Sequence, residues 1–181
     1  MQSQRRNFHL AFAAILLALL IICAQITIPL PMIPLTLQPL GVGMIGSLLS
    51  PLWAGVTILA YLFLGSVGLP VFAGFYGGAS AFLTPSGGYL PAFLVYAVLT
   101  ALFLKNREKN WRNVFIANTV ASLIYLVLGS LWLCLPFIAG MPVKAALMAG
   151  TVPFVLPVLG EIVIYTTIVV ALDKVMKKRM R

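Results

Sequence analysis

The chain has 181 residues, of which 62% are hydrophobic and 8% are charged, and its formal net charge at pH 7 is +9. No Asp, Glu, Lys or Arg occurs between Arg6 and Lys105. A soluble domain, in which about one quarter of the residues are charged, could not cover its surface in this way, so we predict an integral membrane protein.

The positive charge does not indicate a nucleic-acid partner, because the basic residues gather at the ends of apolar runs. The clusters are Arg5 and Arg6; Lys105, Arg107, Lys109 and Arg112; and Lys174, Lys177, Lys178, Arg179 and Arg181. Such clusters follow from the excess of Lys and Arg in cytoplasmic segments of membrane proteins. We therefore predict that both termini lie in the cytoplasm.

The first predicted element is a membrane-spanning helix at residues 10–28, which has the length of about 20 apolar residues that crosses a bilayer. Ala14 and Ala18 form a small-xxx-small pair in this helix, and such a pair lets another helix approach closely. Residues 28–39 then carry four prolines and Gln38. Since proline restricts φ, this segment is predicted to be a stiff, extended lid.

Residues 39–65 form either one long helix or two short helices that break at Ser50 and Pro51. If both termini are cytoplasmic, the number of crossings is even, and this favours two helices, at 39–50 and 52–65. Proline supports the break, because it lacks an N–H group and disfavours helix in the residue before it. Helices this short need neighbouring helices to bury their ends.

The segment between Gly68 and Gly88 carries six glycines and two prolines among aromatic residues. It is too irregular for a helix and too apolar for a solvated linker. Such backbone at a membrane surface packs on protein or lines a cavity, where its amides and carbonyls can meet a ligand. Phe75, Tyr76, Gly77 and Gly78 are therefore candidate ligand contacts; the alternative is an apolar turn that only caps the helices.

Further spans are predicted at 88–104, 114–136 and 151–172, which completes a single all-α domain over residues 1–181. The predicted fold is a compact bundle of six transmembrane helices with irregular outer loops that cap a ligand pocket. Glu161 is the carboxylate well within a span, and a buried ionisable group is a functional candidate. Tyr165 follows it by four residues and shares its helix face. Tyr89 and Asn118 are further candidates, although tyrosines also anchor interfaces and amides also bridge helices.

The sequence offers little chemistry for catalysis. It has no GxxxxGK[ST] pattern for ATP, no cluster with metal-ligand spacing and no pair of carboxylates that could work together. We therefore predict neither an enzyme nor a bound metal or cofactor; a small membrane enzyme using serine or tyrosine is the remote alternative.

Several motifs resemble those of the BioY family, the biotin-binding S components of energy-coupling factor (ECF) transporters. They are Thr36-Leu-Gln-Pro39, Gly65-Ser-Val-Gly-Leu-Pro-Val-Phe-Ala-Gly74, Gly77-Gly78 and Thr84-Pro-Ser-Gly-Gly-Tyr-Leu90. The resemblance runs from about residue 10 to 172. It implies a protein of the cell membrane that captures biotin from outside. It also implies docking through Ala14 and Ala18 on a transmembrane coupling subunit with two ATPase subunits, which alone use ATP.

One position departs from the family pattern, in which an Asp of the last helix is followed three residues later by a Lys. Glu161 and Ile164 stand there, so the acceptor for ureido N–H groups is kept and the lysine charge is missing. A related acid without a ureido group, such as lipoate, is therefore the alternative ligand. The predicted ligand contacts are Gln38, Phe75, Tyr76, Gly77, Gly78, Tyr89, Asn118, Glu161 and Tyr165.

Overall fold

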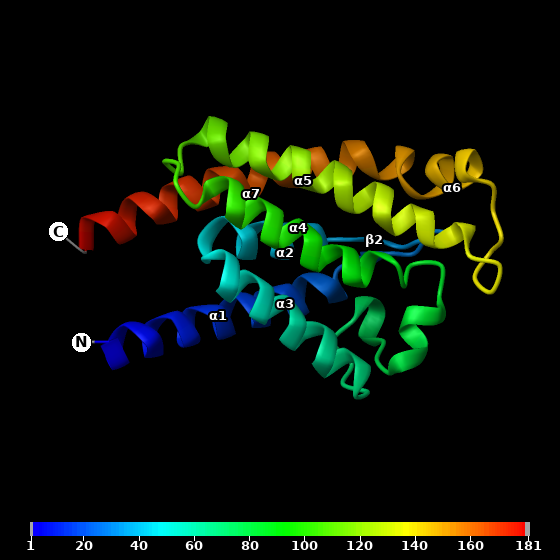
Figure 1. Ribbon diagram of the computed structural model, residues 1–181, viewed down its shortest axis with the longest axis horizontal. Coiled ribbons are helices and arrows are strands. Elements are labelled where there is room, and N and C mark those ends of the chain that lie inside the picture. Colours follow the sequence, from blue (N-terminus) through cyan, green and yellow to red (C-terminus); the bar gives the residue numbers. More distant parts are fainter. Residues whose placement is uncertain (1, 180–181) are drawn as a thin grey trace.

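A computed structural model describes residues 2–179 of the chain and the side chains of residues 7–175 (Figure 1). The basic side chains of Arg5 and Arg6, and those from Lys177 to Arg181, lie outside this described part. The α-helices are α1 (Gln2–Gln25), α2 (Gln38–Leu48), α3 (Pro51–Ser66), α4 (Tyr89–Leu104), α5 (Trp111–Leu131), α6 (Val143–Gly150) and α7 (Val152–Arg179). Short 3-10 helices are η1 (Ala73–Phe75), η2 (Ala79–Leu83) and η3 (Trp132–Cys134). The predicted all-α bundle is confirmed, with α6 as a short addition to the six longer helices.

The distribution of side chains suits a lipid solvent. Three helical stretches, Asn7–Gln25, Trp111–Cys134 and Val143–Val175, are long and apolar enough to cross a membrane. Large apolar side chains point outward, with Phe63 65% and Leu156 79% exposed, whereas Gln38 and Asn118 are buried. An apolar surface is stable in a bilayer, and burial keeps polar side chains away from the hydrocarbon, where unpaired polar groups are costly.

Helix α2 is enclosed by α1, α4, α5 and α7 and is buried from Gln38 to Leu48, apart from a half-buried Leu40. At about 1.5 Å per residue its 11 residues extend over roughly 16 Å, about half of the hydrocarbon core. Neighbouring helices therefore shield its ends from lipid. The chain leaves α2 in extended backbone at Leu49 and Ser50, and Pro51 starts α3, where its missing N–H is not needed.

Glycines allow the neighbouring helices to approach α2 closely. A Cβ atom added at Gly43 would lie 2.5 Å from the Tyr165 hydroxyl, and one at Gly46 would lie 2.7 Å from the carbonyl oxygen of Ala97. No side chain fits at such distances without a shift of its neighbours. These glycines thus place α4 and α7 directly against the backbone of α2.

Two segments differ from the predicted elements. The first helix ends at Gln25 rather than near residue 28, because Thr27–Ile28 (β1) pairs with Leu35–Thr36 (β2) in an antiparallel hairpin across the proline-rich turn. The connection expected at residues 137–150 contains α6, which starts after Pro142, and α5 ends at Leu131 rather than near residue 136. Helix α6 is short and contains several alanines, and its sequence did not predict a separate helix.

The two ends of the bundle differ in character. The start of α1 and the described C-terminal end of α7 lie at one end of the bundle, together with the turn between α4 and α5 (Figure 1). The irregular segments, at residues 26–37, 67–88 and 132–142, gather at the opposite end (Figure 1). The irregular end is therefore the place to look for a ligand site.

Candidate functional site

A cavity of about 340 Å³ opens at the irregular end of the bundle. It is lined by Ile33, Pro34, Leu35, Thr36, Gln38, Pro39, Phe72, Ala73, Tyr76, Ala81, Thr84, Ser86, Tyr89, Leu90, Phe93, Tyr125, Leu126, Phe154 and Val158. The hairpin, the glycine-rich segment and helices α2, α4, α5 and α7 all contribute. The volume falls at the lower end of the range of about 300–1,000 Å³ that small-molecule sites occupy.

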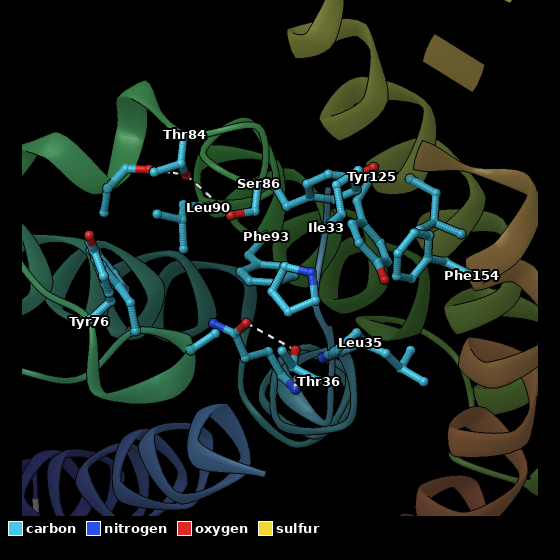
Figure 2. A pocket seen from close by; sticks show the side chains of 18 of the residues that line it. Ile33, Leu35, Thr36, Tyr76, Thr84, Ser86, Leu90, Phe93, Tyr125 and Phe154 are labelled. Atoms are coloured by element: carbon cyan, nitrogen blue, oxygen red, sulfur yellow. Dashed lines mark hydrogen bonds between the residues drawn. The ribbon is translucent and has the colours of Figure 1, made fainter. Parts of the chain in front are cut away.

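Aromatic rings form much of the cavity wall. Tyr125 of α5 stacks on Tyr96 of α4 with 5.0 Å between ring centroids, and it packs at 5.6 Å against Phe93. Figure 2 shows Phe93 between Tyr76 and Phe154, which stand on opposite sides of the view. Among the described side chains that line the cavity, none is charged. The cavity therefore suits a mostly apolar ligand with few polar groups.

The main polar group in the cavity is the amide of Gln38, and its neighbours fix its orientation. The Tyr61 hydroxyl donates to the carbonyl oxygen of Val71 (3.0 Å), so it accepts from Gln38 Nε2 (2.7 Å). Thr36 Oγ1 donates to Gln38 Oε1 (3.0 Å; Figure 2). One N–H of Nε2 and one lone pair of Oε1 are left for a ligand, side by side on one amide.

A second polar group lies at the glycine-rich segment. Thr84 Oγ1 donates to the carbonyl oxygen of Ala81 (2.7 Å), which uses its single hydrogen. Ser86 Oγ is 3.2 Å from Thr84 Oγ1 and is therefore the donor of that pair (Figure 2). Ser86 consequently offers only acceptor lone pairs to the cavity.

The glycine-rich segment is a packed structure. The carbonyl oxygen of Gly65 accepts from the N–H of Gly78 (2.7 Å), and the N–H of Phe72 donates to the carbonyl oxygen of Tyr76 (2.9 Å). A Cβ atom at Gly77 would overlap the carbonyl oxygen of Leu69, so this position requires glycine. The segment thus lines a cavity with irregular backbone, as the composition indicated.

The structure brings three predicted ligand contacts together at the cavity: Gln38, Tyr76 and Tyr89. Phe75 lies outside the lining with its side chain 69% exposed, because the turn directs it outward. Gly77 and Gly78 also lie outside the lining and shape the segment instead: Gly78 has φ +99°, which side chains rarely adopt.

The deeper predicted residues lie below the cavity. Phe154 and Val158 of α7 line it, and Glu161 follows on the next turn. The Glu161 carboxyl group is buried and keeps Oε2 without a hydrogen-bond partner. Glu161 itself does not line the cavity.

Tyr165 and Asn118, two further predicted ligand contacts, do not line the cavity. The Tyr165 hydroxyl is 2.7 Å from that of Tyr96, and Asn118 Nδ2 donates to Ser47 Oγ at 2.9 Å. Both groups join helices at levels further from the irregular end. Such bonds between polar side chains join helices, although Asn118 Oδ1 keeps no hydrogen-bond partner.

Several lining or supporting residues had no sequence signal. Tyr61 orients Gln38, and Tyr125 and Phe154 form the wall, yet each is an aromatic residue in an apolar helix. Tyrosine and phenylalanine are common in such helices. Only the rotation of each helix about its axis, which the sequence does not define, turns these rings toward the cavity.

Comparisons with known proteins agree with this arrangement. The sequence model described as the BioY family matches residues 1–178. The chain belongs to the BioY family. Biotin transporter BioY2 of Lactococcus lactis subsp. cremoris (strain MG1363) is 36% identical, over 82% of this chain and 80% of its own length. Biotin transporter BioY of Thermotoga maritima (strain ATCC 43589 / DSM 3109 / JCM 10099 / NBRC 100826 / MSB8) is 35% identical, over 92% of this chain and 96% of its own length.

A solved structure shares the fold of this chain. The crystal structure of the S-component for biotin from an ECF-type ABC transporter matches with a TM-score of 0.88 and 31% sequence identity. The match covers 96% of this chain and 95% of the other. The resemblance read from the motifs is therefore confirmed at the level of family and fold, and the chain is a membrane protein of transporter type.

Proposed function

We propose that this BioY protein is the membrane subunit that binds biotin for an ECF-type uptake transporter. One observation carries the proposal: an apolar cavity with a single oriented amide opens at the irregular end of a bundle that matches the S-component for biotin over nearly its whole length. In this role the protein captures and releases the vitamin unchanged, which is transport rather than catalysis.

The free groups in the cavity complement the ureido ring of biotin. That ring carries a carbonyl acceptor and two N–H donors. The free N–H and lone pair of Gln38 suit the carbonyl and one N–H, and Ser86 offers an acceptor for other N–H groups. Glu161 follows the lining residue Val158 by three residues in α7, and its Oε2, which has no partner, would accept a further N–H. The aromatic wall suits the sulfur-containing ring.

The carboxylate of the ligand is expected to stay near the open side of the cavity. None of the described lining residues carries a charge, and burying an unpaired carboxylate is costly. Tyr76 lines the cavity and is 57% exposed, which places a hydroxyl-bearing ring at the opening. Ile164, at the position of the family's lysine, is 57% exposed, and it does not line the cavity.

Lipoate is the alternative ligand, and the cavity argues against it. Lipoate shares an acid chain and a sulfur-containing ring with biotin but has no ureido group. It would leave the free N–H and lone pair of Gln38 unpaired in a buried place. Sites built around hydrogen-bonding groups reject analogues that cannot pair them.

The transport partners are the coupling subunit and the two ATPase subunits of an ECF module, which use the ATP. Ala14 and Ala18 support this, because both are exposed on α1 and would let another helix approach. We place the protein in the cell membrane with both termini in the cytoplasm. The turn between α4 and α5 lies at the same end as the start of α1 and the described end of α7, and its basic cluster suits the cytoplasmic side.

The test is the identity of the bound molecule. The protein is expressed in cells supplied with biotin and lipoate, purified in detergent, and analysed by mass spectrometry of the released ligand. We expect biotin, and we expect bound radiolabelled biotin to be displaced by desthiobiotin, which keeps the ureido ring, but not by lipoate. Recovery of lipoate alone, or no binding of either acid by folded protein, would contradict the proposal.

A further inference from the structure

We propose that the side chain of Gln25 is a positioning group, a latch that fastens the turn at residues 72–76 to the end of α1 and so sets the rate at which ligand leaves the cavity. Gln25 is the last residue of α1, and it does not line the cavity. The identity of the ligand rests on the proposed function; the latch itself rests on the contacts below.

Both the oxygen and the nitrogen of the Gln25 side-chain amide form hydrogen bonds with the turn. Oε1 accepts from the N–H of Phe75 at 2.7 Å, and Nε2 donates to the carbonyl oxygen of Phe72 at 3.4 Å. Nε2 also donates to the carbonyl oxygen of Ile21 at 3.1 Å, one turn back in α1. The side chain is thus fixed on its own helix while it bonds two residues of the turn.

The unusual backbone conformation of this turn explains why it needs a hydrogen-bond acceptor from outside the turn. Gly74 and Phe75 have consecutive positive φ values, +68° and +61°, and the bond from Phe72 N–H to Tyr76 O closes the turn around them. Phe75 is the one non-glycine residue of the described chain with positive φ. A bulky side chain keeps this conformation only where its surroundings hold it. In this protein, the bond from the Phe75 N–H to Gln25 Oε1 holds Phe75 in that conformation.

The fastened turn is also part of the cavity wall. Phe72, Ala73 and Tyr76 all line the cavity, so the side of the turn away from Gln25 faces the ligand. Phe72 also packs edge-on against Tyr61, 5.4 Å between centroids, and Tyr61 orients Gln38. Loss of the Gln25 hydrogen bonds would therefore loosen the cavity wall formed by the turn. It would also weaken the packing of Tyr61, which orients Gln38.

The first test compares dissociation rates of radiolabelled biotin from purified protein in lipid nanodiscs. We expect Gln25→Leu, which removes the bonds to the turn, to release biotin about tenfold faster than the unmodified protein. Gln25→Glu keeps an acceptor for Phe75 N–H and should release it more slowly than Gln25→Leu. Thr27→Val is the matched control, since Thr27 Oγ1 bonds only Ala24 O at the same helix end, and it should leave the rate unchanged.

Two results would overturn the latch: folded Gln25→Leu protein that releases biotin at the unmodified rate, or Gln25→Glu protein that releases it as fast as Gln25→Leu. If Gln25→Leu does not fold, Gln25→Asn takes its place, because its shorter side chain cannot reach the turn and stay bonded to α1.

A second measurement needs no ligand, so it separates failure of the latch from failure of the proposed function. In hydrogen–deuterium exchange, the peptide that covers residues 72–76 should exchange faster in Gln25→Leu than in the unmodified protein. The peptide that covers η2 should exchange equally in both. Equal exchange of residues 72–76 in the two proteins would refute the latch whether or not biotin binds.

Discussion

Two buried polar side chains, Gln38 of α2 and Glu161 of α7, differ in how completely their hydrogen-bonding groups are satisfied. Gln38 has three hydrogen bonds that involve its side chain or its own N–H, so its amide is held in one orientation. Glu161 keeps Oε2 without a partner. A buried acceptor without a partner is costly, and such a group is expected where a ligand or water completes it.

Glu161→Ala tests whether that oxygen accepts from the ligand. We expect the dissociation constant for biotin to rise at least tenfold, a loss of about 1.4 kcal/mol, because a buried N–H of the ligand loses its acceptor. Isothermal titration calorimetry measures this change. Glu161→Gln, which keeps an acceptor oxygen, should lose less affinity. An Ala variant with unchanged affinity and a lower melting temperature would assign Glu161 to the packing of α2 alone.

The sequence identified polar and aromatic residues as candidates for the site, but it did not indicate which of their side chains point toward the cavity. Gln38, Tyr76 and Tyr89 reach the cavity because they flank the irregular segments that enclose it. Asn118 and Tyr165 were equally polar in sequence, but they lie further along their helices and bond other helices. Depth along a helix and rotation about its axis depend on tertiary packing, which local pattern does not specify.

At the scale of elements, the glycines of α2 determine how closely the bundle packs. Helix α2 is too short to span a bilayer and depends on neighbours that touch its backbone. The break near Ser50 and Pro51 could be predicted from proline chemistry and from the parity of the crossings. The contacts at Gly43 and Gly46 could not, because a glycine in an apolar helix has the same local signal whether it faces lipid or another helix.

Gly43→Ala should destabilise the fold. The new Cβ would lie 2.5 Å from the Tyr165 hydroxyl and 2.9 Å from that of Tyr96, and overpacking of this kind costs about 1–3 kcal/mol. Gly55→Ala in α3 is the matched control, because its Cβ would meet Val98 at an ordinary 3.5 Å. Thermal unfolding in detergent should show a lower melting temperature for Gly43→Ala only. Equal melting temperatures would mean that α2 is not closely packed there.

At the scale of the whole molecule, the cavity lies at the end of the bundle opposite the start of α1 and the described end of α7 (Figure 1). Helix α1 connects the two ends: its last residue contacts the turn over the cavity, and its exposed alanines face outward further along. A partner bound to α1 would therefore contact the same helix that supports the cavity wall.

Ala18→Trp tests the outward face of α1. We expect uptake of radiolabelled biotin by cells that contain the complete transporter to fall at least tenfold, since a large ring prevents close helix approach. Binding by the purified subunit should stay unchanged, because Ala18 does not line the cavity. Ala171→Trp, an exposed alanine of α7, is the control. Normal uptake by Ala18→Trp would remove this face from the docking surface.

The central claim is that biotin occupies the cavity at the irregular end, and filling that cavity tests it most directly. Ala73 lines the cavity, whereas Ala79 is exposed six residues later in the same segment. Equilibrium binding of radiolabelled biotin is measured for Ala73→Trp and Ala79→Trp, with folding checked by melting temperature. We predict that Ala73→Trp loses biotin binding and that Ala79→Trp retains it; a folded Ala73→Trp protein that binds with unchanged affinity would contradict the account.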